Sequence, residues 1–201
     1  MKQVLVFLTD GFADWEASYV CAELNNPQSG YEIKTIAVDL EPKTSMGGLK
    51  VLPDYAASGS EWRQLDVAML ILPGGTGWND PINEQAKDTI RQCLDLEAGI
   101  AAICDATTFL GRHGFLEEHK HTGNMLVNLK HGAPDYRGDI LYVDAQAVAD
   151  GPLITANGSA AVEFAKLILE KLGVYQGEAL EQWYDVFKKG YLQDFTEIRA
   201  C

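Results

Sequence analysis

Cys104 lies in the stretch with the clearest chemical potential, Ala102–Ile103–Cys104–Asp105–Ala106. The apolar run 100–103 predicts a buried strand, and a helix-compatible run follows Cys104 with no turn residue between. A strand that becomes a helix at one residue bends sharply there, and the side chain at the bend points outward above the carboxyl end of the sheet. The small residues Ala102 and Ala106 allow strand and helix to approach closely. This pattern predicts a nucleophile elbow with Cys104 at its tip.

The position of Cys104 before a helix suggests a specific chemistry. A thiol at a helix N-terminus feels the positive end of the helix dipole, which favours the thiolate. The first N–H groups of the helix have no intrahelical partner, so they are free to stabilise an oxyanion. The alternative is a buried cysteine that closes the strand and packs as a small apolar residue.

A glycine-rich loop, Pro73–Gly74–Gly75–Thr76–Gly77, follows a second apolar run at 67–72 and favours the chemical interpretation of Cys104. Its glycines indicate either a tight turn or a backbone that approaches a ligand with exposed N–H groups. It lacks the Gly-Lys-Ser/Thr ending of a Walker loop. Trp78, just after the glycines, would either form a wall of the pocket or cover the core.

Acidic residues accompany these motifs. Asp14 is a plausible N-cap of a helix over 15–24, and Glu16 lies in its first turn. Glu16 is either an ordinary first-turn acid or a partner of Cys104, because both residues follow the ends of adjacent predicted strands. A carboxyl beside a thiolate has a raised pKa and is able to donate a hydrogen bond or move a proton. With Asp14 and Asp105 near the same rim and no arginine, an anionic substrate is disfavoured.

These residues need a scaffold of alternating strands and helices. Apolar or alternating runs predict strands at 4–8, 31–38, 67–72, 100–103, 147–149 and 153–155, with a small hairpin at 45–51 and a further short strand at Tyr142. Amphipathic runs predict helices at 15–24, 82–96, 105–112, 125–130, 159–172 and 178–189. The order predicts an α/β fold with a mostly parallel sheet, in which ligands bind at the carboxyl ends of the strands.

Composition limits the class of protein. With 201 residues the chain fits a single domain, and its net charge of −13 argues against nucleic acid or an anionic membrane as partner. The four cysteines, Cys21, Cys93, Cys104 and Cys201, are far apart, which suits a reducing compartment. The apolar run 4–8 is too short for a signal peptide, and no run reaches transmembrane length, so we expect a cytoplasmic protein. No His/Cys/Asp cluster has metal-ligand spacing, so no metal or other cofactor is expected.

The combination of motifs resembles the ThiJ/PfpI superfamily, which is related to class I glutamine amidotransferases. The resemblance covers residues 2–172 and rests on Glu16 after the first strand, Leu72–Pro73–Gly74–Gly75, Ala102–Ile103–Cys104, and the stretch 153–159 that leads into Glu163. It implies one domain over residues 1–201, folded as a flavodoxin-like three-layer sandwich. It also implies a reactive Cys104, a hydrogen bond from Glu16 to the thiol, and an oxyanion hole from the N–H groups of Gly75 and Asp105.

The sequence departs from the superfamily in its histidines. In one branch a histidine directly follows the cysteine, where Asp105 stands here; in another it comes about twenty residues later, where counting reaches Asn124. Asparagine cannot take a proton, so His121 is the best candidate base, ahead of His113 and His119. If the segment is extended, strand alternation places His121 and Asn124 on opposite faces.

Three functions remain open at this point. The first is a cysteine-dependent hydrolase or amidase with Cys104, Glu16 and His121 as catalytic residues, acting on a small molecule or peptide. Its pocket would include Gly74, Trp78, Asn124 and Asp14.

The second is an oxidative-stress or redox-sensing protein with an oxidisable Cys104 and little turnover. The third, a glutaminase subunit, is disfavoured because a C-terminal His-x-Glu pair is absent. Members of the superfamily are commonly oligomers. Apolar residues on the first and last helices, such as Trp15, Tyr19 and Phe187, therefore suggest a homodimer.

Overall fold

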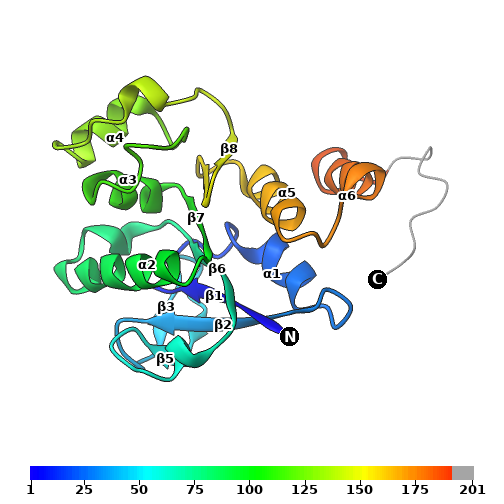
Figure 1. The fold of residues 1–201 in the computed structure, drawn as a ribbon, viewed down its shortest axis with the longest axis horizontal. Coiled ribbons are helices and arrows are strands. Elements are labelled where there is room, and N and C mark those ends of the chain that lie inside the picture. The colour runs from blue at the N-terminus through cyan, green and yellow to red at the C-terminus, as the bar shows by residue number, and fades with distance from the viewer. Residues whose placement is uncertain (192–201) are drawn as a thin grey trace.

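A seven-stranded sheet forms the centre of the protein in a computed structural model that describes residues 1–191 (Figure 1). The strands lie in the order β5-β2-β1-β6-β7-β9-β8, and only the pair β8 and β9 is antiparallel. Their bounds are β1 Lys2–Phe7, β2 Tyr31–Ala37, β5 Tyr55–Ala56, β6 Val67–Leu72, β7 Gly99–Ile103, β8 Ala147–Asp150 and β9 Leu153–Ala156. The strands β3 Lys43–Thr44 and β4 Lys50–Val51 form a separate antiparallel hairpin. Cys201 lies outside the described residues.

Helices cover both faces of the sheet, which gives the three-layer sandwich that was predicted. One face carries α2 Ala86–Asp95, α3 Asp105–Arg112 and α4 Leu126–Gly132; the other carries α1 Ser18–Leu24, α5 Ala161–Lys171 and α6 Gly177–Lys189 (Figure 1). Short 3₁₀ helices occur at Trp62–Gln64, Thr76–Asn79, Pro81–Gln85 and Asp139–Leu141. No helix within residues 1–191 has the length and apolarity needed to cross a membrane.

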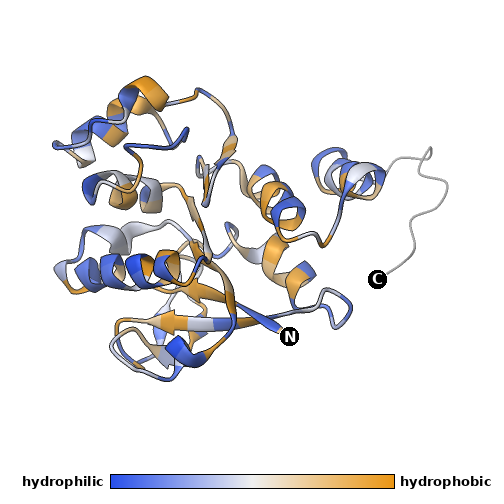
Figure 2. Cartoon of the chain, viewed as in Figure 1, coloured by the Kyte–Doolittle hydropathy of each residue, from blue (hydrophilic) through white to orange (hydrophobic). Residues whose placement is uncertain are grey.

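The central strands supply side chains to two cores because successive residues point to opposite faces. In β1, Leu5 and Phe7 pack on the α2–α3 side while Val4 and Val6 pack on the α1–α5 side. The apolar colour of these strands in Figure 2 reflects burial on both faces. This explains the continuous apolar runs from which the strands were predicted.

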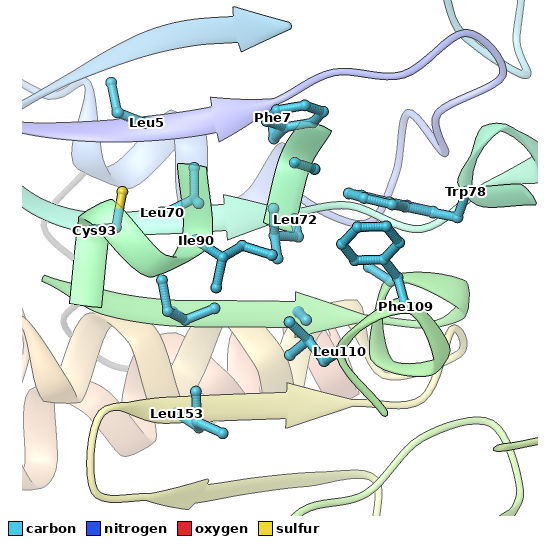
Figure 3. Packing of buried hydrophobic residues seen from close by; sticks show 14 of the residues in the cluster. Leu5, Phe7, Leu70, Leu72, Trp78, Ile90, Cys93, Phe109, Leu110 and Leu153 are labelled. Atoms are coloured by element: carbon cyan, nitrogen blue, oxygen red, sulfur yellow. The ribbon is translucent and has the colours of Figure 1, made fainter. Parts of the chain in front are cut away.

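Trp78 belongs to the core. Its ring lies between Phe7 and Phe109, with centroid distances of 5.8 and 4.7 Å, and its indole N–H donates to the Pro73 carbonyl at 2.8 Å (Figure 3). It is 1% exposed. Of the two roles considered for Trp78, the structure therefore gives covering the core, and not forming a wall of the site.

Several predicted boundaries need correction. Helix α1 begins at Ser18, so Asp14 is not its N-cap and Glu16 precedes the helix. The edge strand β5 was not predicted, because two residues are too few to show a pattern. Helix α2 begins only at Ala86, after a 3₁₀ turn that starts at Pro81.

Candidate active site

Cys104 occupies the predicted elbow. Strand β7 ends at Ile103, helix α3 begins at Asp105, and Cys104 between them has φ 59° and ψ −127°. A positive φ is costly for a residue with a Cβ, and such strain persists only where the surrounding structure enforces it. The sharp bend and strained backbone that the sequence predicted at Cys104 are confirmed.

Two glycines pack against this cysteine. A Cβ added at Gly74 would lie 2.5 Å from Cys104 Cβ, and one added at Gly158 would lie 2.7 Å from Cys104 Sγ. The same added Cβ atoms would also lie close to Glu16. The one at Gly74 would be 2.9 Å from Glu16 Oε2, and the one at Gly158 would be 3.2 Å from Glu16 Oε1. Gly74 and Gly158 therefore admit the thiol and the carboxyl together because neither has a side chain. Gly158 belongs to the stretch 153–159 that carried the resemblance, but it was not predicted as a site residue, although it follows β9 closely and so lies at the same sheet edge as Cys104.

Glu16 is a buried acid, 1% exposed, on the loop between β1 and α1. Its Oε2 accepts a hydrogen bond from the Gly74 N–H at 2.6 Å. Its Oε1 is buried and has no hydrogen-bond partner among the described residues. The Cys104 thiol lies beside this carboxyl, because both groups pack against Gly74 and Gly158. Burial raises the pKa of Glu16 to about 7, although the hydrogen bonds from Gly74 and Cys104 lower it.

The Cys104 thiol is protonated in this environment. Burial raises its pKa to about 11, the Asn124 hydrogen bond lowers it, and the negative charges of Glu16 and Asp105 raise it. These effects oppose the stabilisation of the thiolate by the start of α3. Even so, burial raises the pKa of Cys21 and Cys93 further, to about 12 each. Among the three cysteines within residues 1–191, Cys104 keeps the lowest thiol pKa.

Asn124 contacts the sulfur directly. Its Nδ2 donates to Cys104 Sγ at 3.3 Å, and its Oδ1 accepts from the Gly158 N–H at 2.8 Å. The second bond fixes the orientation of the amide, because only the oxygen accepts from an N–H. Asn124 is therefore a hydrogen-bond donor to the sulfur.

Within residues 1–191, the backbone N–H groups of Gly75 and Asp105 have no backbone partner. Gly75 pairs with Phe12 in an antiparallel bridge whose hydrogen bonds run from Ala13 N to Gly74 O and from Thr76 N to Gly11 O. This pattern turns the Gly75 N–H away from Phe12, and none of the backbone hydrogen bonds of residues 1–191 uses it. The Asp105 N–H, at the start of α3, interacts with the Cys104 thiol.

His121 does not join this group. It is fully buried, its Nε2 pairs with the Tyr136 hydroxyl at 2.5 Å, and its Nδ1 pairs with the His119 carbonyl at 2.6 Å. Burial lowers the pKa of His121, which favours the neutral ring. Both ring nitrogens are therefore occupied by groups other than Cys104. Residues 121–124 form no strand, so strand alternation does not apply to His121 and Asn124.

The other candidate bases are also engaged elsewhere. His113 lies 3.1 Å from a Glu84 carboxyl oxygen and packs on Phe109, and His119 lies 3.8 Å from Asp150. Within residues 1–191, which include every histidine of the chain, no hydrogen bond joins a histidine to Cys104.

Asp14 anchors a neighbouring hairpin. Its carboxyl accepts from the Ser45 hydroxyl and, at 2.7 Å, from the Gly47 N–H, and the Ser45 hydrogen bond lowers the pKa of Asp14. These bonds attach the β3–β4 turn to the segment that carries Glu16.

The described residues hold no group of three or more His, Cys, Asp or Glu side chains placed to bind a metal ion. A surface cavity of about 490 Å³ between α2 and the segment after β5 contains none of the residues around Cys104.

The chain is similar to known proteins over nearly its whole length. The profile of the DJ-1/PfpI family matches residues 2–171. The chain belongs to the DJ-1/PfpI family. It is 34% identical over 203 residues to "Uncharacterized protease YoaZ" of Bacillus subtilis, covering 98% of this chain and 96% of that protein.

Solved structures of the DJ-1/PfpI fold agree with this assignment. A thiJ/pfpI family protein from Bacillus anthracis has a TM-score of 0.86 at 34% identity, covering 94% of this chain and 92% of the other. A DJ-1 superfamily protein from Agrobacterium tumefaciens has a TM-score of 0.84 at 36% identity, and the match covers 94% of this chain and 98% of the other. The resemblance stated from the sequence is therefore confirmed.

Proposed function

We propose that this DJ-1/PfpI protein is a cysteine-dependent hydrolase of amide or related acyl bonds. The observation that carries the proposal is the pairing of the half-buried Cys104 thiol with the buried Glu16 carboxyl at the elbow. The backbone N–H of Gly75, in the loop that packs on this pair through Gly74, has no backbone partner among the described residues. YoaZ, which is named an uncharacterized protease and aligns with this chain over almost its whole length, supports the same class of reaction.

The first step is attack by Cys104 Sγ on the carbonyl carbon of the substrate. Glu16 accepts the thiol proton as the S–C bond forms, and a base with a pKa near 7 is well matched to neutral pH. The carbonyl oxygen becomes an oxyanion that accepts hydrogen bonds from the N–H groups of Gly75 and Asp105. These two groups are fixed in the backbone, so they need no rearrangement during the reaction.

The second half of the reaction returns the proton. The tetrahedral intermediate collapses to a thioester, the C–N bond breaks, and protonated Glu16 donates its proton to the leaving amine. Water then attacks the thioester carbon, and Glu16 takes the proton of that water. The C–S bond breaks as the second tetrahedral intermediate collapses, the acid product leaves, and Glu16 returns the proton to the Cys104 sulfur. Glu16 is the only base in this scheme, because Asn124 donates a hydrogen bond to the sulfur and cannot take a proton.

The surroundings of Cys104 favour a neutral or cationic substrate. Glu16 and Asp105 both raise the thiol pKa through their negative charge, and an anionic group would meet the same repulsion. We therefore expect a small molecule or peptide with an uncharged acyl group.

We also propose a homodimer. Of the apolar residues that suggested it, Tyr19 and Phe187 pack on each other at 5.1 Å, while Trp15 remains 48% exposed. Trp15 and Phe187, which is 44% exposed, therefore remain available for a contact with a second copy.

The test is a panel of amide, ester and aldehyde substrates assayed with the wild type, Cys104→Ser and Glu16→Gln. The proposal expects turnover of at least one substrate, loss of turnover in Cys104→Ser, and a decrease of about a hundredfold or more in Glu16→Gln. Equal turnover in the wild type and Cys104→Ser would refute it.

A redox function is the second candidate, and the raised pKa of Glu16 favours it. A protonated Glu16 is able to donate a hydrogen bond to an oxygen on an oxidised Cys104 sulfur. Peroxide should then convert Cys104 selectively to a sulfinate, and Glu16→Leu should change how far the oxidation proceeds. Efficient sulfinate formation without turnover of any substrate would favour this function over hydrolysis.

A further inference from the structure

Trp15 joins two segments of the site that lie far apart in sequence. Its neighbours are both fixed, Asp14 to the β3–β4 turn and Glu16 to the Gly74 N–H. Its own indole N–H donates to the Gly158 carbonyl at 3.4 Å, 143 residues away. Trp15 is half exposed, so this bond and not burial gives the ring its place in the structure.

Gly158 in turn connects to the sulfur. Its N–H donates to Asn124 Oδ1 at 2.8 Å, and Asn124 Nδ2 donates to Cys104 Sγ at 3.3 Å. The three hydrogen bonds therefore run from Trp15 through Gly158 and Asn124 to Cys104.

Other hydrogen bonds hold the residues on either side of Gly158, and among them the Ala160 N–H donates to the Asn157 carbonyl at 3.0 Å. Asn157 donates from its N–H to the Gln146 carbonyl at 3.0 Å, and its side chain accepts from the N–H and hydroxyl of Ser159. Within the described residues, the hydrogen bond to the Gly158 carbonyl comes from Trp15. Because glycine has no Cβ to restrict its backbone, this bond limits the rotation of Gly158 that would turn its N–H away from Asn124.

We propose that Trp15 is a positioning residue for the Cys104 thiol. It acts through Gly158 and keeps the Asn124 amide directed at the sulfur, where the amide stabilises the thiolate formed during reaction. The proposal rests on the proposed function in one respect, the role of Cys104 as the reactive thiol.

The test compares Trp15→Phe, which removes the indole N–H and keeps an aromatic ring, with Trp183→Phe. Trp183 is a matched control because its indole N–H also donates one hydrogen bond, to Glu23 at 2.8 Å, and Glu23 belongs to α1 and not to the site. The readout is the rate of Cys104 alkylation by iodoacetamide from about pH 7 to pH 11, a range that reaches the raised pKa of this thiol, followed by mass spectrometry of the Cys104 peptide. We expect Trp15→Phe to react about threefold more slowly than the wild type near pH 7.5, with its pH profile shifted upward, and Trp183→Phe to react like the wild type.

A double variant separates positioning from a direct effect of the ring. If Trp15 acts through Asn124, then Trp15→Phe causes no further slowing in an Asn124→Ala background. Additive slowing, or unchanged alkylation in Trp15→Phe, would overturn the proposal. Slow and unselective labelling of Cys104 in the wild type would instead overturn the proposed function itself.

A second readout does not depend on reactivity. The side-chain NH₂ signals of Asn124, identified by their loss in Asn124→Ala, should shift in the NMR spectrum of Trp15→Phe and stay unchanged in Trp183→Phe. Trp15→Tyr, which also lacks an indole N–H, should give the same shift and the same slowing. Unshifted signals in either folded Trp15 variant would contradict the proposal.

Discussion

Glutamine at position 16 would keep the size of Glu16 and remove its ability to ionise. Burial raises the pKa of this carboxyl from 4.5 to about 7 in the folded chain. A carboxyl whose pKa is higher when folded than when unfolded binds its proton more tightly in the folded state. The free energy of unfolding therefore falls as the pH rises from the unfolded pKa through the folded pKa.

The magnitude follows from the difference between the two pKa values. The shift from 4.5 to about 7 corresponds to about 3 kcal/mol, since each pKa unit is worth about 1.36 kcal/mol. No discount for solvent is needed, because Glu16 is 1% exposed. The free energy of unfolding of Glu16→Gln minus that of the wild type should thus increase by about 3 kcal/mol between about pH 4 and pH 8.

Urea denaturation at intervals across that pH range measures this difference. Glu163→Gln is the control of opposite sign. Although burial raises the pKa of Glu163, hydrogen bonds from Lys188 and Tyr184 outweigh it and hold the pKa below its usual value. The ionised Glu163 stabilises the fold above its unfolded pKa and loses that effect as the pH falls. Glu163→Gln should therefore be destabilised near pH 7, by an amount that shrinks toward pH 3.

A pH-independent difference between Glu16→Gln and the wild type would refute the reasoning. It would mean that Glu16 stays ionised when folded, and that its buried carboxylate has a stronger partner than the Gly74 N–H. Glu16 would then be a poor base for the Cys104 thiol at neutral pH.

Further predictions concern the thiol and the assembly. Gly158→Ala should slow alkylation of Cys104 at least about tenfold, because the new Cβ would lie 2.7 Å from the sulfur; mass spectrometry checks this, and unchanged labelling would contradict the packing. Iodoacetamide should label Cys104 before Cys21 and Cys93, whose thiol pKa values are higher, and equal rates would contradict the assignment of the reactive sulfur. Light scattering should give the mass of a homodimer at micromolar concentration, and a monomer mass would exclude the proposed assembly.

Much of the fold could be predicted because its signals are local. The apolar runs of β6 and β7 show burial on both faces, and the absence of a turn after Ile103 places a bend at Cys104. Since the carboxyl ends of parallel strands share one edge, these signals also bring Glu16, Gly74 and Cys104 together.

The remaining site features depend on contacts that local patterns do not encode. Gly158 looks like an ordinary residue before a helix, and only the pairing of β9 with β7 places it against the sulfur. His121 seemed the best base because of its residue type, but its ring is buried against Tyr136. Burial and the negative charges of two carboxyl groups raise the pKa of the Cys104 thiol, and these contacts come from segments that the local pattern around Cys104 does not show.

The central claim is that Cys104 forms a covalent acyl intermediate. Rapid acid quenching of the protein with reactive ester or amide substrates, followed by intact and peptide mass spectrometry, measures this directly. We predict a single acyl adduct on Cys104 that forms faster than it decays, is absent in Cys104→Ser, and forms far more slowly in Glu16→Gln. Turnover without any adduct on Cys104, or an adduct on Cys21 or Cys93 instead, would contradict the account.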